Sequence, residues 1–107
     1  MGWIEIEAFS LVEGVDNAAF ARLDDEMQAW CYLHRPRLVR RTTGRGEGTA
    51  TLVVTLFGHG APPVPVEAPD GPAAAFRSAI DASTYRRAVY RDHDEPDPDG
   101  PATAAPG

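Results

Sequence analysis

Two glutamates, Glu5 and Glu7, stand two positions apart in the alternating run WIEIEAF near the start of the chain. A strand rises about 3.3 Å per residue, which puts these two side chains on one face, about 6.6 Å apart along the strand. If water is excluded from that face, the two carboxylates repel each other and the pKa of one of them rises. Such a pair can act as a general acid and base. The alternative is that both carboxylates are solvated, or paired with arginines on a facing strand.

A second candidate group lies in the run AWCYLHRP, where Trp30 and His34 are four positions apart and Cys31 and His34 are three apart. Residues at these spacings are neighbours on a helix surface. His34 could be a base or a hydrogen-bond donor in a pocket wall that includes Trp30. The alternative is a core tryptophan, an inert buried thiol and a histidine stabilised by the negative end of the helix dipole.

All ten basic residues are arginine, and five of them fall within eleven positions, namely Arg35, Arg37, Arg40, Arg41 and Arg45. Alternation along a strand sends Arg37 and Arg41 to one face and Arg40 to the other. One arginine of this cluster could pair with Glu5 or Glu7, or hold an anionic or enolate substrate, and we take Arg41 as the catalytic candidate. The alternative is a solvated strand edge, where charge discourages aggregation.

The remaining candidates would form a substrate pocket rather than carry out chemistry. They are the wall residues Trp3, Trp30 and Phe57, the strand residues Thr51 and Thr55, and His59 on the glycine-flanked bend FGHG. His59 is a mobile gate, a ligand or a surface histidine. A glutamate pair with a histidine could hold a metal, but no ligand spacing beyond Glu-x-Glu supports one. Phosphate-binding glycine loops, zinc-ligand spacings and Ser/His/Asp signatures are also missing, so we expect neither a metal nor a cofactor.

The elements that must position these residues follow from hydrophobic periodicity. Alternation predicts strands at 3–9, 37–43, 49–57 and 84–91. A helix is predicted at 16–35, with Asp16 or, one residue on, Asn17 as its N-cap, Pro36 as its stop and a buried stripe at steps of three and four. That stripe consists of Phe20, Leu23, Met27, Trp30 and His34. The glycine- and proline-rich segment 58–72 is a long loop, and a second helix runs from Pro72 to about residue 81.

The order β-α-β-β-α-β predicts an α+β, ferredoxin-like antiparallel sheet with both helices on one face. We expect the face with Ile4, Ile6 and Ala8 to meet the helices. The opposite face would carry both glutamates together with the large side chains Trp3, Phe9, Val53 and Phe57. An uncovered face with such aromatics is unlikely to stay in water, so we expect a second copy to cover it and to enclose the glutamates in a lumen.

Composition indicates one domain, at 1–91, followed by an acidic, Pro/Gly-rich tail at 92–107 that we expect to be disordered. Five of the sixteen acidic residues lie in that tail, so residues 1–91 carry eleven acids against ten arginines and are nearly neutral. This balance, and the single aromatic in the strand TATLVVTLF, argue against nucleic-acid binding.

The rest of the composition bears on the compartment. The single cysteine, Cys31, excludes an intrachain disulfide and fits a reducing environment. The chain has no signal-peptide pattern, and no apolar run approaches the roughly 20 residues of a membrane helix. We therefore expect a cytoplasmic protein with no membrane partner.

Four runs of this chain resemble the dimeric α/β-barrel superfamily, and most of all its small antibiotic-biosynthesis-monooxygenase-like proteins of unassigned function. They are WIEIEAF, FARLDDEMQAWCYLHRP, RLVRRTTGRGE and TATLVVTLF, within about residues 3–91. The resemblance implies a homodimer whose two sheets enclose a barrel, with a cavity between sheet and helices or in the lumen. Haem-degrading relatives use a histidine on the second helix, which the run AAAFRSAID lacks. Quinone-forming relatives use asparagine, tryptophan and arginine, and here Asn17, Trp3 and Trp30 stand in no matching motif.

These observations favour a small-molecule tailoring enzyme of secondary metabolism that needs no organic cofactor. The resemblance alone implies an oxygenase, and an isomerase or cyclase fits the residues equally well. The enzyme's substrate would be hydrophobic, and aromatic or polyketide-like, with Glu5, Glu7, His34 and an arginine handling protons. The alternative is a non-catalytic homodimer that binds a ligand or stabilises a partner. That alternative predicts that Glu5 and Glu7 are both fully paired with arginine and that no cavity holds more than waters.

Overall fold

The computed structural model describes residues 2–93, so most of the predicted tail, from 94 onward, lies outside the described residues. The elements are β1 (Trp3–Ser10), α1 (Asn17–His34), β2 (Leu38–Arg45), β3 (Ala50–Phe57), α2 (Gly71–Ser78), a short 3-10 turn (Ala82–Thr84) and β4 (Arg86–Arg91). The predicted order is confirmed. The boundaries differ by one to three residues, most of all at α2 and β4, where the 3-10 turn replaces the predicted start of the last strand.

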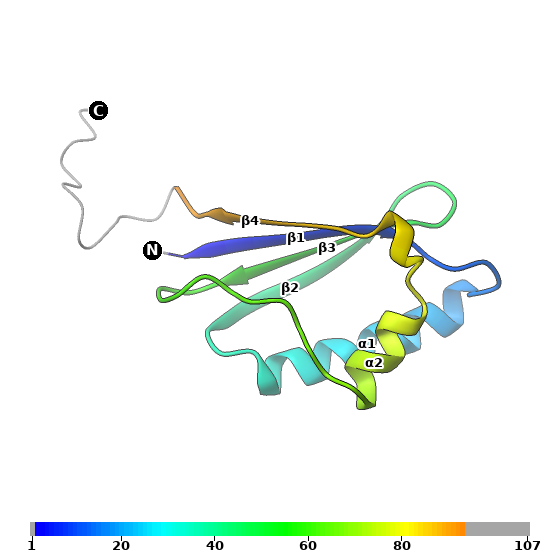
Figure 1. Ribbon diagram of the computed structural model, residues 1–107, viewed down its shortest axis with the longest axis horizontal. Helices are drawn as coiled ribbons and strands as arrows, with labels where there is room; N and C mark the ends of the chain where they lie inside the picture. The colour runs from blue at the N-terminus through cyan, green and yellow to red at the C-terminus, as the bar shows by residue number, and fades with distance from the viewer. Residues whose placement is uncertain (1, 94–107) are drawn as a thin grey trace.

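The four strands form one antiparallel sheet in the order β2-β3-β1-β4. Figure 1 shows the sheet as one layer and both helices as a second layer on one of its faces. The two central strands pair along their whole length, with Trp3 opposite Phe57 and Ser10 opposite Ala50. The ferredoxin-like fold class predicted from the element order is therefore confirmed.

Helix α1 begins and ends where local chemistry predicts. The side chain of Asp16 accepts a hydrogen bond from the backbone N–H of Ala19 at 2.7 Å, which satisfies one of the otherwise unpaired donors of the first turn. At the other end the N–H of Arg35 donates to the carbonyl of Cys31 at 2.9 Å, and Pro36 follows. The C-terminal turn thus delivers the Arg35 side chain to the edge of the helix–sheet interface.

The stripe of α1 that meets the sheet differs from the predicted one. Phe20, Met27 and Cys31 are buried, whereas His34 is exposed and Trp30 is only partly buried. The helix is rotated so that three residues outside the predicted stripe, Asp24, Gln28 and Arg35, reach side chains of the sheet. The predicted helix is confirmed, but polar residues occupy part of the stripe that faces the sheet.

The prediction of which sheet face meets the helices was wrong. Phe9, Val53 and Phe57 are all buried on the helix side, together with Glu5. The reason is packing volume: Phe9 meets the ring of Phe76 on α2 edge to face at 6.0 Å between centroids, and the smaller aliphatic side chains lie on the other face. Because strand side chains alternate with a period of two, Trp3, Glu5, Glu7 and Phe9 all lie on the same face, so the error in the face applies to all four.

The face that turns away from the helices is apolar at its centre, with Arg40 and Arg86 on its edge strands. In register across the two central strands, Ile4 lies opposite Leu56, Ile6 opposite Val54 and Ala8 opposite Leu52. Leu52 is 42% exposed and Leu56 is 36% exposed in the single chain. This open face, and not the one with the glutamates, is the uncovered apolar surface of the described chain.

The loop at 58–70 connects β3 to α2 and crosses the side of the molecule between the sheet and the helices (Figure 1). It is fixed to the sheet near its start, where the indole Nε1 of Trp3 donates to the carbonyl of Gly60 at 2.9 Å. Gly60 has a φ of +145°, a backbone conformation that glycine adopts more readily than other residues. The loop thereby forms one wall of the space between the layers.

Candidate active site

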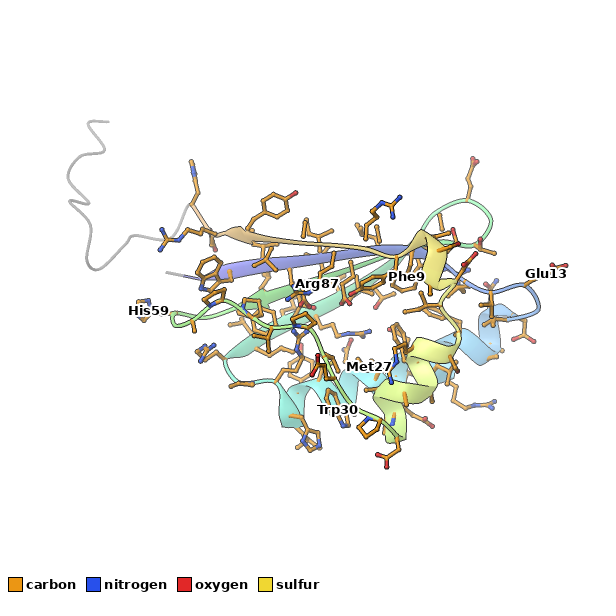
Figure 2. All side chains as sticks on the ribbon, in the orientation of Figure 1. Phe9, Glu13, Met27, Trp30, His59 and Arg87 are labelled. Atoms are coloured by element: carbon orange, nitrogen blue, oxygen red, sulfur yellow. The ribbon has the colours of Figure 1, made fainter. Side chains whose placement is uncertain are left out.

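A pocket of about 220 Å³ lies between the sheet and the two helices. Its wall is mostly apolar, with contributions from Met27, Phe76 and Ile80, and its polar lining includes Glu7, Arg35, Arg41, Arg77 and Tyr85. Figure 2 shows Met27 pointing from α1 into the space between the layers. A small apolar pocket with a few convergent polar groups is typical of a small-molecule site. We call it the Glu7 pocket.

Glu7 is the carboxyl group of this pocket. The phenol of Tyr85 donates a hydrogen bond to Glu7 Oε2 at 2.6 Å. Burial raises the pKa of Glu7 above its ordinary value; the Tyr85 hydrogen bond opposes this rise and the charge of Glu5 adds to it, and the net shift is upward. Burial together with the carboxylate of Glu7 also raises the pKa of Tyr85. Tyr85 therefore stays protonated and donates, which leaves Glu7 as the group that can accept or release a proton.

Glu5 has a different environment although it shares the strand face. Its carboxylate is 1% exposed and accepts from Arg35 Nη1 at 2.7 Å, Arg35 Nη2 at 2.9 Å and Arg87 Nε at 2.9 Å. Burial acts to raise the pKa of Glu5, but the hydrogen bonds and charges of the two arginines outweigh it and lower the pKa. Glu5 is therefore a carboxylate at neutral pH, and its contacts are those of a structural anchor rather than of a proton carrier.

The two glutamates thus meet part of the sequence-based expectation. One pKa does rise, although burial is the main cause and repulsion between the carboxylates is a smaller one. The expected location is wrong, because both residues lie under the helices and not in a lumen between two copies.

Arg41 also lines the pocket, and two residues of α1 hold its guanidinium in place. Its Nη2 lies 2.9 Å from Asp24 Oδ1, and its Nη1 donates to Gln28 Oε1 at 3.3 Å. The guanidinium also lies over the ring of Phe76, 5.3 Å from the centroid. Arg41 is 5% exposed, so its charge acts at low dielectric on any group that enters the pocket. The structure brings Arg41 and Glu7 into one pocket, as their types suggested.

His34 and Trp30 belong to a second pocket and not to the Glu7 pocket. Their rings are in contact at the end of α1, with centroids 4.8 Å apart and the ring planes tilted by 33°. They line a neighbouring pocket of about 460 Å³, which we call the Trp30 pocket, together with Phe57, Arg35 and the loop. His34 therefore does not meet Glu7. Cys31 does line the Glu7 pocket, but burial raises the pKa of its thiol, as the inert alternative requires.

The other predicted pocket residues lie outside the Glu7 pocket. Trp3 stacks under the guanidinium of Arg91, 5.3 Å from the ring centroid, and the hydroxyl of Thr51 donates to the carbonyl of Thr49 at 3.2 Å. Figure 2 places His59 at the left end of the molecule, opposite Glu13 at the right end. The buried hydroxyl of Thr55, which is opposite Glu5 and Arg41 in the sheet register, has no hydrogen-bond partner among residues 2–93.

Two residues of the site, Tyr85 and Arg87, were not predicted, whereas Arg35 belongs to the arginine cluster from which a partner of Glu5 or Glu7 was expected. Arg35 carried a signal, because it shares the helix stripe with Asp24, Gln28 and Cys31 when that stripe is allowed polar members. Tyr85 lies 78 positions from Glu7, and no motif surrounds it. Only the pairing of β1 with β4 brings this end of the chain beside the pocket.

Residues 2–93 contain no group of three or more histidine, cysteine, aspartate or glutamate side chains that could hold a metal ion. Over the same residues, every helix is too short or too polar to cross a bilayer.

Comparison with known proteins reveals a similar fold but little sequence similarity. No protein-family model matches the chain, and no curated protein matches its sequence. Among solved structures it is similar to a mutant of SnoaB, a cofactor-independent oxygenase from Streptomyces nogalater, with a TM-score of 0.58. The two sequences are 13% identical, and the match covers 88% of this chain and 95% of SnoaB. The resemblance of fold expected from the sequence is therefore confirmed: this chain has the fold of that oxygenase.

The anchor role of Glu5 predicts a large loss of stability in Glu5→Gln. Removing the carboxylate leaves two arginines without their counter-charge, which costs about 3 kcal/mol of unfolding free energy. Because the pKa of Glu5 is lowered in the folded state, its contribution is present above its ordinary value of 4.5 and is lost as pH falls through the folded-state pKa. Urea unfolding from pH 7 to pH 3 should therefore show a smaller difference between wild type and variant at the acid end. The exposed Glu26→Gln is the control, and equal stability of all three proteins at pH 7 would contradict the role.

Proposed function

We propose that this protein is a small-molecule tailoring enzyme that binds a hydrophobic, aromatic or polyketide-like substrate in the Glu7 pocket and uses Glu7 as its base. The observation that carries the proposal is the half-buried Glu7–Tyr85 pair in an apolar pocket that Arg41 also lines. A carboxyl group with a raised pKa, next to a fixed donor and a buried cation, is an arrangement suited to proton transfer.

The chemistry starts with removal of a proton from a weakly acidic phenol O–H, or from a C–H beside a carbonyl. Glu7 takes the proton while Tyr85 fixes the orientation of its carboxylate through Oε2. The negative charge that develops on the substrate oxygen is stabilised by the guanidinium of Arg41, whose own position is set by Asp24 and Gln28. Oxygenation, isomerisation and cyclisation can all begin from this anion, without an organic cofactor.

The fold of a cofactor-independent oxygenase supports oxygenation as the first of these reactions to test. In that case dioxygen is the second substrate and accepts electrons from the substrate anion. Because folds of this kind host many chemistries, the support comes from the pocket and the fold together.

A non-catalytic ligand-binding or interaction protein is the second candidate. Glu5 is fully paired with arginine, as that interpretation expects. Glu7 is bonded to Tyr85 instead, and the two pockets are larger than a few water molecules require. These two observations favour the enzyme.

We further propose that the functional unit is a homodimer joined through the open face of the sheet. Leu52, Leu56 and their neighbours form an apolar surface across the two central strands. A second copy of the same face would remove it from water. The Glu7 pocket lies on the opposite side of the sheet in each copy, so each protomer would hold its own site.

The first test is Glu7→Gln assayed with hydroxylated naphthalenes and anthracenes, following oxygen uptake and product mass. We expect kcat/KM to fall at least 100-fold, because an amide cannot accept the proton. The pKa of Glu7 is raised in the folded state, so wild type loses stability as pH rises through that pKa. The variant does not, and its Tm at pH 8 should exceed that of wild type by a few degrees.

Glu26→Gln, at an exposed position, is the matched control and should change neither kcat/KM nor the Tm at pH 8. Undiminished turnover in Glu7→Gln would contradict the role of Glu7. Failure of the wild-type protein to bind any of these phenols would contradict the substrate class.

Tyr85→Phe tests the hydrogen bond to Glu7 through the pH dependence of activity. The Tyr85 hydroxyl favours the ionised form of Glu7, so its removal raises the pKa of Glu7 further. The acidic limb of the kcat/KM profile should therefore move to higher pH. Tyr90→Phe, at an exposed position on β4, is the control. An acidic limb at the same pH in all three proteins would exclude Glu7 as the titrating base.

The dimer proposal is tested by Leu56→Lys on the open face. A lysine there would put two charges into the interface, so we expect the dimer dissociation constant to rise at least 100-fold, as measured by analytical ultracentrifugation. Leu33→Lys on α1 changes an apolar residue that is 81% exposed on the helix side, and should leave the dimer intact. A monomeric wild-type protein at micromolar concentration would refute the proposal.

A further inference from the structure

The Glu7 pocket and the Trp30 pocket are neighbours with a common wall. Only Arg35, Pro65 and Val66 line both pockets. The arginine comes from the end of α1, and the other two come from the loop that crosses between the layers. We call these three residues the partition.

The arginine half of the partition is held on several sides. Arg35 makes a two-pronged contact with Glu5, and its Nη2 also donates to the carbonyl of Val64 at 3.0 Å. The guanidinium lies over the ring of Phe57, 4.8 Å from the centroid. Its side chain is only 8% exposed. A planar guanidinium with this many fixed contacts cannot swing aside without breaking a buried ion pair.

The loop half of the partition is tied to the same carboxylate. Arg87 donates through Nε to Glu5 and through Nη2 to the carbonyl of Pro63, both at 2.9 Å. Figure 2 shows Arg87 on the helix side of the sheet, beneath the strands. Two arginines on one glutamate therefore hold the loop backbone at Pro63 and Val64, immediately before Pro65 and Val66. The ring constraint of Pro65 stiffens this segment further.

The Trp30 pocket, on the far side of the partition, is suited to planar apolar groups. Trp30 and Phe57 supply aromatic faces, and prolines of the loop supply an apolar edge. A ligand whose reacting end lies at Glu7 could extend into this pocket only if the partition moved.

We infer that Arg35, Pro65 and Val66 determine ligand length, by confining a compact ligand to the Glu7 pocket and excluding extensions that would enter the Trp30 pocket. This inference rests on the proposed function, because it places the reacting end of the ligand at Glu7. It makes Glu5 and Arg35 positioning residues that act on specificity.

The test compares two probes with the same phenolic end, 2-naphthol and 6-phenyl-2-naphthol, by isothermal titration calorimetry. Wild type should bind the longer phenol at least tenfold more weakly. Val66→Ala trims the partition and leaves the ion pairs intact. It should reduce the ratio of the Kd for the longer phenol to the Kd for 2-naphthol at least threefold. Val39→Ala, at an exposed position that lines neither pocket, should leave the ratio unchanged.

A second variant removes the charged half of the partition. Glu5→Gln combined with Arg35→Met takes away both charges of that contact, and should reduce the Kd ratio at least tenfold. The double variant Arg22→Met with Glu26→Gln, on exposed positions of α1, is its control. Thermal unfolding of every variant shows which are folded. If the Glu5→Gln/Arg35→Met variant is unfolded, the result for Val66→Ala alone tests the inference.

Two results would overturn the inference alone: equal affinity of wild type for both phenols, or a Kd ratio that does not change in Val66→Ala. If wild type binds neither phenol, the proposed function fails and the inference fails with it. Binding of 2-naphthol therefore separates the two failures.

Discussion

The carboxylate of Glu5, buried between two arginines, is the interaction on which the arrangement of the site depends. A lone charge in this position would be strongly unfavourable, so Arg35 and Arg87 must both be present. Those two arginines come from the end of α1 and from β4, and each also holds a carbonyl of the crossing loop. One carboxylate thus links the central strand, a helix end, an edge strand and the loop.

The same pairing explains why the second glutamate is available for chemistry. Glu5 occupies the nearby Arg35 and Arg87, and Arg41 is engaged by Asp24 and Gln28, so Glu7 is left with the neutral phenol of Tyr85. Burial then raises the pKa of Glu7 instead of lowering it. Two glutamates on one strand face acquire opposite pKa shifts because their partners differ in charge, which is the usual way that paired carboxylates take different roles.

The likeness to SnoaB at 13% identity shows how little sequence the fold requires. Alternating strands, two amphipathic helices and correct turn chemistry specify this topology, and many sequences meet those conditions. The proposed chemistry depends on a few side chains at the helix–sheet interface. In this chain those side chains form an unusually polar interface, with Glu5, Arg41 and Thr55 all nearly inaccessible to solvent.

The sequence by itself determined the order of elements, the Asp16 cap and the stop of α1 at Pro36, because these follow from local periodicity and backbone geometry. It also determined that Glu5 and Glu7 share a face. Alternation leaves the choice of face open, since both faces of β1 carry large apolar residues, and only packing of Phe9 against Phe76 decided it. Tertiary structure likewise decided that Tyr85 meets Glu7 and that Arg35 meets Glu5, because those contacts join residues 78 and 30 positions apart. Local patterns carry no information about partners at that separation.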